Sequence, residues 1–295
     1  MLLAPGHPAD AGLGGWEDAC RQATIAARTA RTDAASLFYG TSRTRVKGIG
    51  LEYVDFREYS LGDDVRHIDW RLSARMVRPD GEMRLMVKEY EAERRVHAVF
   101  AVDLSASMLF GDKIWSLVYS ASLASHLASR LEDEVTLVTM GPARRVQWRL
   151  DPGLVPSILR TMVCRGDVGG DADLEWLAHV ARRTGPAARL LLFTDYDHEP
   201  GDAYAMARGI RMLGGRGHAV VVCERAEVEP PVQEDPLIAL RGLEAGGPVV
   251  GRLSELYEEI QRHVRALRAA LASGRIGVLE IKGRRAALRA KTRIL

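Results

Sequence analysis

The chain has 295 residues, of which 47% are hydrophobic and 27% charged, with a formal net charge of +2. This balance is typical of a globular protein with a sizeable core, and the small net charge gives no reason to expect a nucleic-acid partner. No run of about 18 apolar residues predicts a membrane-spanning helix, and no signal peptide is visible, so we expect a cytoplasmic protein.

The cysteines give no sign of a zinc site or of thioredoxin-like chemistry. Cys20, Cys164 and Cys223 are far apart, contain no C-x-x-C pair and leave one cysteine unpaired in any intramolecular scheme. We therefore expect reduced and mostly buried thiols.

Residues 1–40 form the first predicted segment, a tail followed by a helix. The tail is rich in Gly, Pro and Ala, whereas residues 16–39 are Ala-rich with arginines on the polar side, and Gly40 is a plausible end for the helix. Residues 41–95 differ in character. They carry turn signals, a dense mixture of charges and aromatic residues, and a partial strand pattern over 83–90. We interpret them as a β-rich extension with short strands and irregular structure.

Residues 96–225 alternate between apolar runs and amphipathic segments. Residues 96–102 are almost all apolar, which predicts a central strand covered on both faces. The other predicted strands are 135–139, its hairpin partner 145–148, 189–193 and 218–223, and the predicted helices are 112–130, 152–162, 172–184 and 202–213. Such alternation indicates β-α-β units, so we expect an α/β fold with a doubly wound, mostly parallel sheet and flanking helices.

Residues 226–295 form the last predicted segment. A Pro- and Glu-rich linker over 227–236 leads to an amphipathic helix over 253–271 and a short edge strand over 276–281. The C-terminus is basic through Arg275, Lys282, Arg284, Arg285, Arg289, Lys291 and Arg293. We favour a solvated tail for this stretch, and contact with RNA or an anionic membrane is the alternative.

The first candidate site lies where the strand over 96–102 ends. Asp103, Ser105 and Ser107 alternate along a tight loop, so that one carboxylate and two hydroxyls can converge on one point. All three are hard oxygen donors, which suit Mg²⁺ rather than a soft metal. The alternative is that the two serines only cap the following helix.

A second carboxylate follows another predicted strand. Asp195 lies just past the strand over 189–193, and ligands of parallel sheets bind beyond the carboxyl ends of the strands. If the two strands are neighbours, Asp103 and Asp195 meet at one edge of the sheet, which is costly without a cation or a shared proton. We interpret Asp197, His198 and Glu199 as an exposed turn.

A glycine-containing loop over 165–174 is the third element of the candidate site. Its glycines allow the backbone to approach a ligand closely. Its aspartates, Asp171 and Asp173, either face the site or cap the next helix.

These three loops come in the order of the metal-ion-dependent adhesion site of von Willebrand factor A domains, which the chain therefore resembles. Residues 57–75 carry a narrower resemblance. Their Gly-Asp-Asp-x-Arg-x-Ile-Asp-Trp pattern looks like the signature of the bacterial family called domain of unknown function fifty-eight. The resemblance covers about residues 40–225. It implies a von Willebrand factor A-like domain over 96–225, a bound Mg²⁺, and a role beside MoxR-type AAA+ ATPases in assembling or activating other proteins.

The chain departs from this resemblance at the glycine loop. The family usually has Gly-Gly-Thr-Asp-Leu there, with the Thr hydroxyl helping to hold the ion, whereas this chain has Gly-Gly-Asp-Ala-Asp-Leu. In one alignment Asp171 replaces the threonine, and in the other Ala172 replaces it and offers no donor. The expected metal ligands are therefore Asp103, Ser105, Ser107, Asp195 and, in the first alignment, Asp171.

The segment over 57–75 is strongly charged, and we interpret it as structural rather than catalytic. Its side chains can pair beside a tryptophan and brace the β-rich extension against the α/β domain. Breaking a buried pair of this kind strands a charge at a cost of roughly 3–5 kcal/mol. The residues assigned to the brace are Asp63, Asp64, Arg66, Asp69, Trp70 and Arg75.

Three functions compete. We favour a metal-dependent protein-interaction module, an adaptor between a MoxR-type ATPase and a protein client, in which a partner's carboxylate completes the coordination of the ion. A Mg²⁺-dependent phosphohydrolase is the second; against it, no lysine or histidine is seen to converge on the site. A binder of anionic polymers through the basic C-terminus is the third. We assign no catalytic residue.

Overall fold

The computed structural model describes residues 3–5, 15–41, 53–60, 63–76, 81, 83–90, 97–184, 188–212, 216–229, 235–242 and 249–294. The chain divides into two units: residues 1–39 together with 95–295 form unit 1, and residues 40–94 form unit 2. Unit 2 therefore interrupts unit 1 in the sequence.

A six-stranded sheet forms the centre of unit 1, in the order β11-β8-β7-β4-β5-β6. Its strands are β4 (His97–Asp103), β5 (Glu134–Met140), β6 (Arg145–Leu150), β7 (Arg189–Thr194), β8 (Arg216–Cys223) and β11 (Ile276–Lys282). Neighbouring strands run parallel except β6, which is the antiparallel hairpin partner of β5. The mostly parallel sheet and the hairpin predicted from the sequence are both confirmed.

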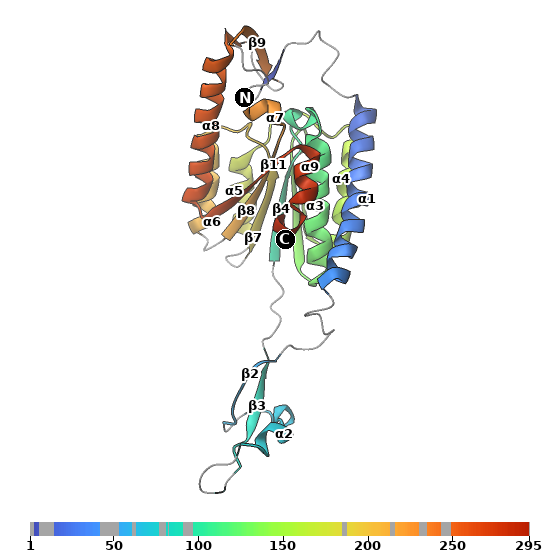
Figure 1. Cartoon of the computed structure of the whole chain (residues 1–295), viewed down its shortest axis with the longest axis vertical. Helices are drawn as coiled ribbons and strands as arrows, with labels where there is room; N and C mark the ends of the chain where they lie inside the picture. Colours follow the sequence, from blue (N-terminus) through green and yellow to red (C-terminus); the bar gives the residue numbers. More distant parts are fainter. Residues whose placement is uncertain are drawn as a thin grey trace. The chain divides into compact units, whose positions relative to one another are not determined.

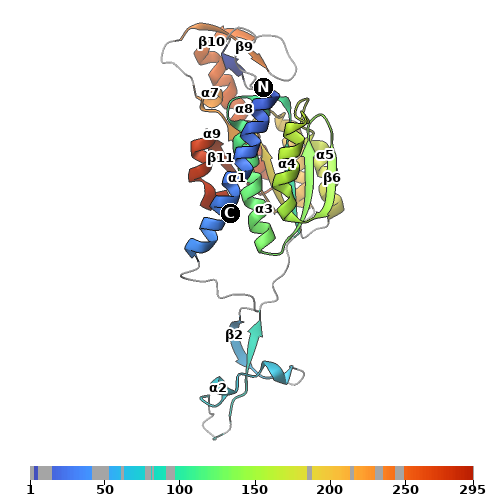
Figure 2. The same cartoon turned by 90° about the vertical axis from the view of Figure 1, so that its right-hand side faces the viewer.

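Helices cover both faces of this sheet (Figure 1 and Figure 2). Strand β4 serves both cores: Ala98, Phe100 and Val102 face one of them, and Val99 and Ala101 the other, as the two-residue period of a strand requires. The first core is covered by α1 (Trp16–Thr41), α3 (Lys113–Arg130), α4 (Val155–Cys164) and α9 (Gly283–Arg289). The second is covered by α5 (Leu174–Thr184), α6 (Pro200–Met212) and α8 (Leu253–Ser273).

The sheet extends past the domain boundary that we predicted at residue 225. β11 pairs with β8, so residues 276–282 belong to the same domain as β4. Apart from Arg275, the basic C-terminal residues lie in β11, α9 and α10 (Lys291–Ile294) and do not form the solvated tail that we expected. The reason is that apolar residues lie among the charges: Ala287 is fully buried, and the Arg284 guanidinium lies 4.5 Å from the centre of the Trp115 ring.

A second, three-stranded sheet in unit 1 was not predicted. It consists of β1 (Leu3–Pro5), β9 (Leu237–Gly242) and β10 (Val249–Arg252), all antiparallel. The start of the predicted linker over 227–236 belongs to a short helix, α7 (Arg225–Val228).

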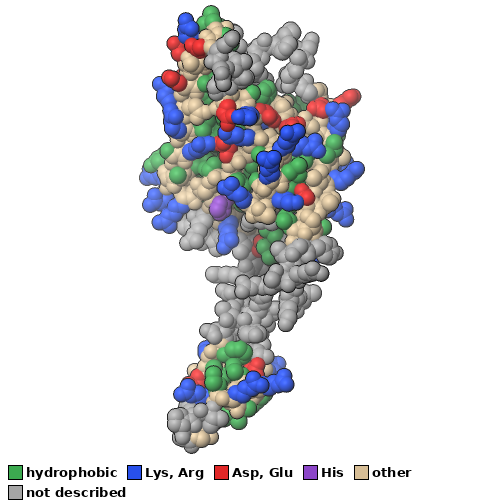
Figure 3. Space-filling model, in the orientation of Figure 1, with side chains coloured by type: hydrophobic (Ala, Val, Ile, Leu, Met, Phe, Trp, Pro, Cys, Tyr) green, Lys and Arg blue, Asp and Glu red, His purple; other side chains and the backbone are tan. Residues whose placement is uncertain are grey.

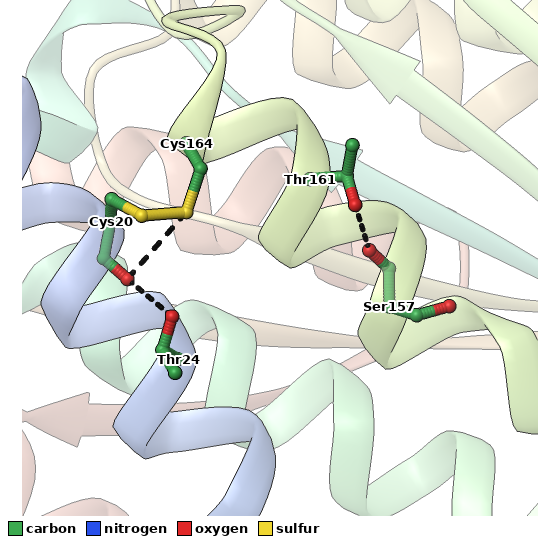
Figure 4. The surroundings of a disulfide bond; sticks show 5 residues. All are labelled: Cys20, Thr24, Ser157, Thr161 and Cys164. Carbon is green, nitrogen blue, oxygen red and sulfur yellow. Dashed lines mark hydrogen bonds between the residues drawn. A yellow bond between two sulfur atoms is a disulfide. The ribbon is translucent and has the colours of Figure 1, made fainter.

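A disulfide joins Cys20 on α1 to Cys164 at the end of α4, with the Cα atoms 4.4 Å apart (Figure 4). The expectation that these two thiols are reduced is therefore wrong, because sequence spacing does not show that α1 and α4 are neighbours. Cys223 is free and buried, as expected. The rest of the α1 contact is a stripe of small buried side chains at helical spacing, formed by Ala19, Ala23, Ala26, Ala30 and Ala34.

Unit 2 contains an antiparallel pair of strands, β2 (Tyr53–Glu58) and β3 (Met86–Tyr90), a 3-10 turn over Val65–His67, and the one-turn helix α2 (Trp70–Ser73). The short strands predicted for this region are confirmed. The Ser73 hydroxyl links α2 to β3, since it accepts a hydrogen bond from Met86 N at 2.8 Å. Hydrophobic side chains gather on the face of unit 2 drawn in Figure 3.

Candidate metal centre

Backbone hydrogen bonds hold the loop after β4 against two glycine-containing loops. Leu104 N donates to Met140 O at 2.6 Å, and Gly169 N donates to Leu104 O at 2.8 Å. Gly141 has a φ of 145°, and a Cβ at this position would lie 2.6 Å from the Leu104 carbonyl oxygen. The close backbone approach predicted for the loop over 165–174 is present, and it fixes the position of Asp103.

Four of the predicted ligands come together at the carboxyl edge of the sheet. Asp103 ends β4, and its Oδ1 accepts from Ser105 N at 2.8 Å. The hydroxyls of Ser105 and Ser107 lie 3.1 Å apart, and Ser107 is hydrogen-bonded to Asp195. Asp195 reaches the same place because β7 is the direct neighbour of β4. All four residues are at most 2% exposed.

His198 joins this cluster, and the exposed turn that we predicted for it is wrong. Its Nε2 lies 3.2 Å from Asp103 Oδ2 and 2.5 Å from the hydroxyl of Thr194, which donates to the same carboxylate oxygen at 2.7 Å. Ligand atoms of Asp103, Asp195 and His198 all lie within 4.8 Å of one another. Burial lowers the pKa of His198, but the hydrogen bond to Asp103 and the charge of that residue raise it overall.

Lys113, the first residue of α3, places an ammonium in the same cluster. Its Nζ donates to Asp195 Oδ2 at 2.6 Å and to Glu227 Oε1 at 2.8 Å. All three side chains are at most 3% exposed. Burial alone would lower the pKa of Lys113, but the two carboxylates raise it, so the amine stays charged.

The pKa values of Asp195 and Glu227, the two carboxylates that accept from Lys113, shift in opposite directions. Burial raises the pKa of both. For Asp195 burial is outweighed by several effects together, namely the charges of Lys113 and His198 and the hydrogen bonds from Lys113 and Ser107, and the pKa lies below its usual range. For Glu227 burial dominates and the pKa stays above its usual range. The ammonium lies slightly closer to Asp195, at 2.6 Å, than to Glu227, at 2.8 Å.

Neither Lys113 nor Glu227 was predicted to belong to the site, and the expectation that no lysine or histidine converges on it is wrong. One signal was available for Lys113: it stands ten residues after Asp103, at the head of a helix with no other Lys, Arg, Asp or Glu before Arg130. Glu227 is the first residue of the predicted linker over 227–236. Its Oε2 caps α7 by accepting from Glu224 N at 2.7 Å.

Asp171, the fifth predicted ligand, is exposed and does not belong to the group of described residues whose ligand atoms come together. Asp173 has a structural role: its Oδ1 caps α5 by accepting from Trp176 N at 2.7 Å, and its Oδ2 lies 2.7 Å from an Arg144 nitrogen. This agrees with the alternative that we left open for Asp173.

The chemical type of the donor atoms in this cluster suits a divalent cation. Carboxylates and hydroxyls are the hard donors that Mg²⁺ prefers, and His198 adds a nitrogen. Two features oppose tight binding, namely the missing donor at the glycine loop and the ammonium of Lys113. An ion at this position stays a prediction, and the residues that would hold it are Asp103, Ser105, Ser107 and Asp195, with Nε2 of His198 nearby.

The charged pairs assigned to the brace lie on the surface of unit 2. Asp63 accepts two hydrogen bonds from Arg57, at 2.6 and 2.7 Å, which lower its pKa to about 2. Asp64 pairs with Arg66 at 2.7 Å, and the Arg66 side chain is 85% exposed. These pairs are not buried within unit 2 itself.

The other residues assigned to the brace are Asp69, Trp70 and Arg75. Asp69 caps α2, with its Oδ1 accepting from Leu72 N at 3.0 Å. Trp70 is 62% exposed, and Arg75 is exposed as well. A brace between the two units stays a prediction.

Residues 55–270 match the family model described as "Protein of unknown function DUF58". This match covers more than half of the chain. The chain belongs to the DUF58 family. The family indicated by residues 57–75 is thereby confirmed, and unit 1 has the von Willebrand factor A-like α/β fold of DUF58 proteins.

Curated relatives match over a short stretch. "Uncharacterized protein Mb1516" of Mycobacterium bovis and "Uncharacterized protein Rv1480" of Mycobacterium tuberculosis are each 35% identical over 75 residues, which is 25% of this DUF58 chain and 22% of each relative. The match thus spans about a fifth of the length of these relatives.

Two solved structures are similar over 68% of this chain and 96% of their own chains. One is the conserved hypothetical protein BatB from Bacteroides thetaiotaomicron, with 15% identity and a TM-score of 0.40. The other is an aerotolerance-related membrane protein from Bacteroides fragilis, with 18% identity and a TM-score of 0.41. Within the described part of the DUF58 chain, no helix has both the length and the apolar character needed to cross a membrane.

Proposed function

We propose that this DUF58 protein is a protein-interaction module that acts as an adaptor to a MoxR-type AAA+ ATPase and a protein client, with Mg²⁺ or another divalent cation at the carboxyl edge of its central sheet. The observation that supports the metal-assisted part is the convergence of Asp103, Ser105, Ser107 and Asp195 from two neighbouring strand ends. The ATPase and the client come from the family resemblance.

The ligands of the ion would come from two loops. Asp103 and the two serines would hold the ion from the loop after β4, and Asp195 from the loop after β7. A bound cation would supply an electrophilic centre to which a partner's Asp or Glu can attach. Because the holding residues are at most 2% exposed, a partner must shift the covering loops to reach them.

Retention of a purified MoxR-type ATPase on the immobilised full chain, in Mg²⁺ and in EDTA, tests the proposal. We expect retention by the wild type in Mg²⁺ and loss with Asp103→Ala. The control is Asp202→Ala, which removes an exposed carboxylate from the first turn of α6 and should change nothing. Undiminished retention by a folded Asp103→Ala variant refutes the proposal. Equal wild-type retention in EDTA removes only its metal dependence.

A Mg²⁺-dependent phosphohydrolase is the second candidate, and the presence of Lys113 and His198 in the site favours it more than the sequence did. Both groups are already paired, however: Lys113 with Asp195 and Glu227, and His198 with Asp103. Each would have to leave a carboxylate partner before it could bind a phosphate ester. Turnover of p-nitrophenyl phosphate that is lost in Asp103→Ala would replace the adaptor proposal.

A cytoplasmic location is part of the same proposal. The Cys20–Cys164 disulfide instead favours an oxidising compartment, because disulfides persist mainly there. Alkylation of thiols in intact cells before lysis separates the two. Modification of both cysteines supports the cytoplasm, and protection of both supports an oxidising compartment.

A further inference from the structure

Three buried side chains from separate parts of unit 1 form one charged cluster. Lys113 comes from the start of α3, Asp195 from the loop after β7, and Glu227 from α7. The ammonium lies 2.6 Å from one carboxylate and 2.8 Å from the other, and the three side chains are at most 3% exposed. A lysine buried to this degree is rare without a specific partner, and this one has two.

The protein satisfies the oxygens of the candidate metal ligands internally. Oδ2 of Asp195 accepts from Lys113 and its Oδ1 from Asp197 N at 2.8 Å. Asp103 is similarly engaged, with Ser105 N on one oxygen and the Thr194 hydroxyl on the other. A divalent cation that binds here must therefore compete with hydrogen bonds that are already made, and above all with a positive charge on Asp195.

Glu227 offers the ammonium of Lys113 a second carboxylate partner. Since Nζ of Lys113 is bonded to both carboxylates, withdrawal from Asp195 would leave the ammonium buried but still paired with Glu227. Glu227 itself is held in place through its other oxygen by Glu224 N. A lone Lys113–Asp195 pair would offer no such position, because an unpaired buried ammonium is costly.

We propose that Lys113 is a built-in counter-ion that occupies Asp195 in the absence of metal and moves to Glu227 when a divalent cation binds. This inference rests on the metal-assisted part of the proposed function and specifies its regulation. Lys113 lowers the affinity of the site for cations, and Glu227 raises it by accepting the displaced ammonium. A static ion pair would let Glu227→Gln weaken cation binding whether or not Lys113 is present, whereas the exchange requires that the effect of Glu227→Gln disappear once Lys113 is replaced.

Calorimetric titration of Mn²⁺ into the full chain tests this inference, with Lys113→Met, Glu227→Gln and the double variant Lys113→Met/Glu227→Gln. The double variant removes one positive and one negative charge, so it keeps the buried net charge and remains informative if Lys113→Met does not fold. The matched control is Lys282→Met, since Lys282 pairs with Glu229 at 2.7 Å but is partly exposed.

We expect Lys113→Met and the double variant to bind Mn²⁺ at least tenfold more tightly than the wild type, Glu227→Gln to bind at least threefold more weakly, and the control to match the wild type. Wild-type affinity in Lys113→Met or the double variant overturns the inference while leaving the metal site intact. Binding by Glu227→Gln that is tighter than wild type overturns it as well. Absence of Mn²⁺ binding in every protein overturns both the inference and the metal dependence in the proposed function.

Discussion

Replacing Lys113 with Met should destabilise unit 1 strongly in the absence of metal. The Lys113 side chain is 1% exposed, and its ammonium lies within 2.8 Å of both Asp195 and Glu227. Methionine is unbranched and flexible enough to fill much of the same space. The substitution leaves two carboxylates buried without a counter-ion. The resulting loss in the free energy of unfolding therefore reflects the missing charge rather than altered packing.

The magnitude follows from these distances. Two unit charges about 2.7 Å apart attract by about 6 kcal/mol at an effective dielectric constant of about 20. The cost of desolvating the ions offsets much of this attraction, and removing one partner of a buried pair typically costs about 3–5 kcal/mol. We therefore expect a loss of about 4 kcal/mol in the free energy of unfolding, with part of it recovered in Lys113→Met/Glu227→Gln because one stranded carboxylate is neutralised.

Urea unfolding followed by circular dichroism in EDTA measures these losses. Lys282→Met is the control and should lose at most about 1 kcal/mol, since the Lys282 side chain is 37% exposed. A loss below about 1 kcal/mol in Lys113→Met would refute the assignment of a buried, charged lysine. A double variant that is less stable than Lys113→Met would show that Glu227 is stabilised by groups other than this ammonium.

Three further predictions concern the loops and the disulfide. Gly141→Ala should lower the melting temperature by several degrees, because its Cβ would meet a backbone carbonyl oxygen at 2.6 Å, whereas Gly201→Ala, with nothing within 4 Å, should not. In denaturant without reductant, maleimide should label one cysteine rather than three, and replacing Cys20 and Cys164 with Ser should cost about 2–4 kcal/mol of stability. Asp171→Ala should leave Mn²⁺ affinity within about twofold of wild type; a tenfold loss would return Asp171 to the ligand set.

The parts of the fold that could be predicted are the strands and helices that a short-range pattern of apolar residues indicates. The apolar run before Asp103 and its helical successor mark β4 and α3, and the order of such units restricts the sheet to a few topologies. The rule that ligands bind beyond the carboxyl ends of parallel strands then brings Asp103 and Asp195 together, and the register of β4 with β7 bears this out. Both steps depend on short-range patterns and on handedness.

The parts that could not be predicted depend on long-range packing. Lys113 and Glu227 are separated by more than one hundred residues and meet only because α3 begins, and α7 lies, at the same edge of the sheet. Nothing near His198 in the sequence distinguishes a buried histidine from one in an exposed turn. The three strands of the small sheet are short, and the pairing of Cys20 with Cys164 requires knowledge of which helices are neighbours.

The altered glycine loop and the buried ammonium are consistent with one electrostatic arrangement. A site with a complete set of oxygen ligands depends on its ion to balance the carboxylates, so losing the ion leaves Asp103 and Asp195 in mutual repulsion. Here the ammonium of Lys113, which lies 2.6 Å from Asp195, supplies that balance from the protein itself. The protein can then fold without a metal ion, and the threonine that would help to hold the ion at the glycine loop is not needed for folding. If the proposed exchange of Lys113 between Asp195 and Glu227 occurs, the ion is a reversible participant in partner binding, and its affinity is set by side chains outside the metal-site motif.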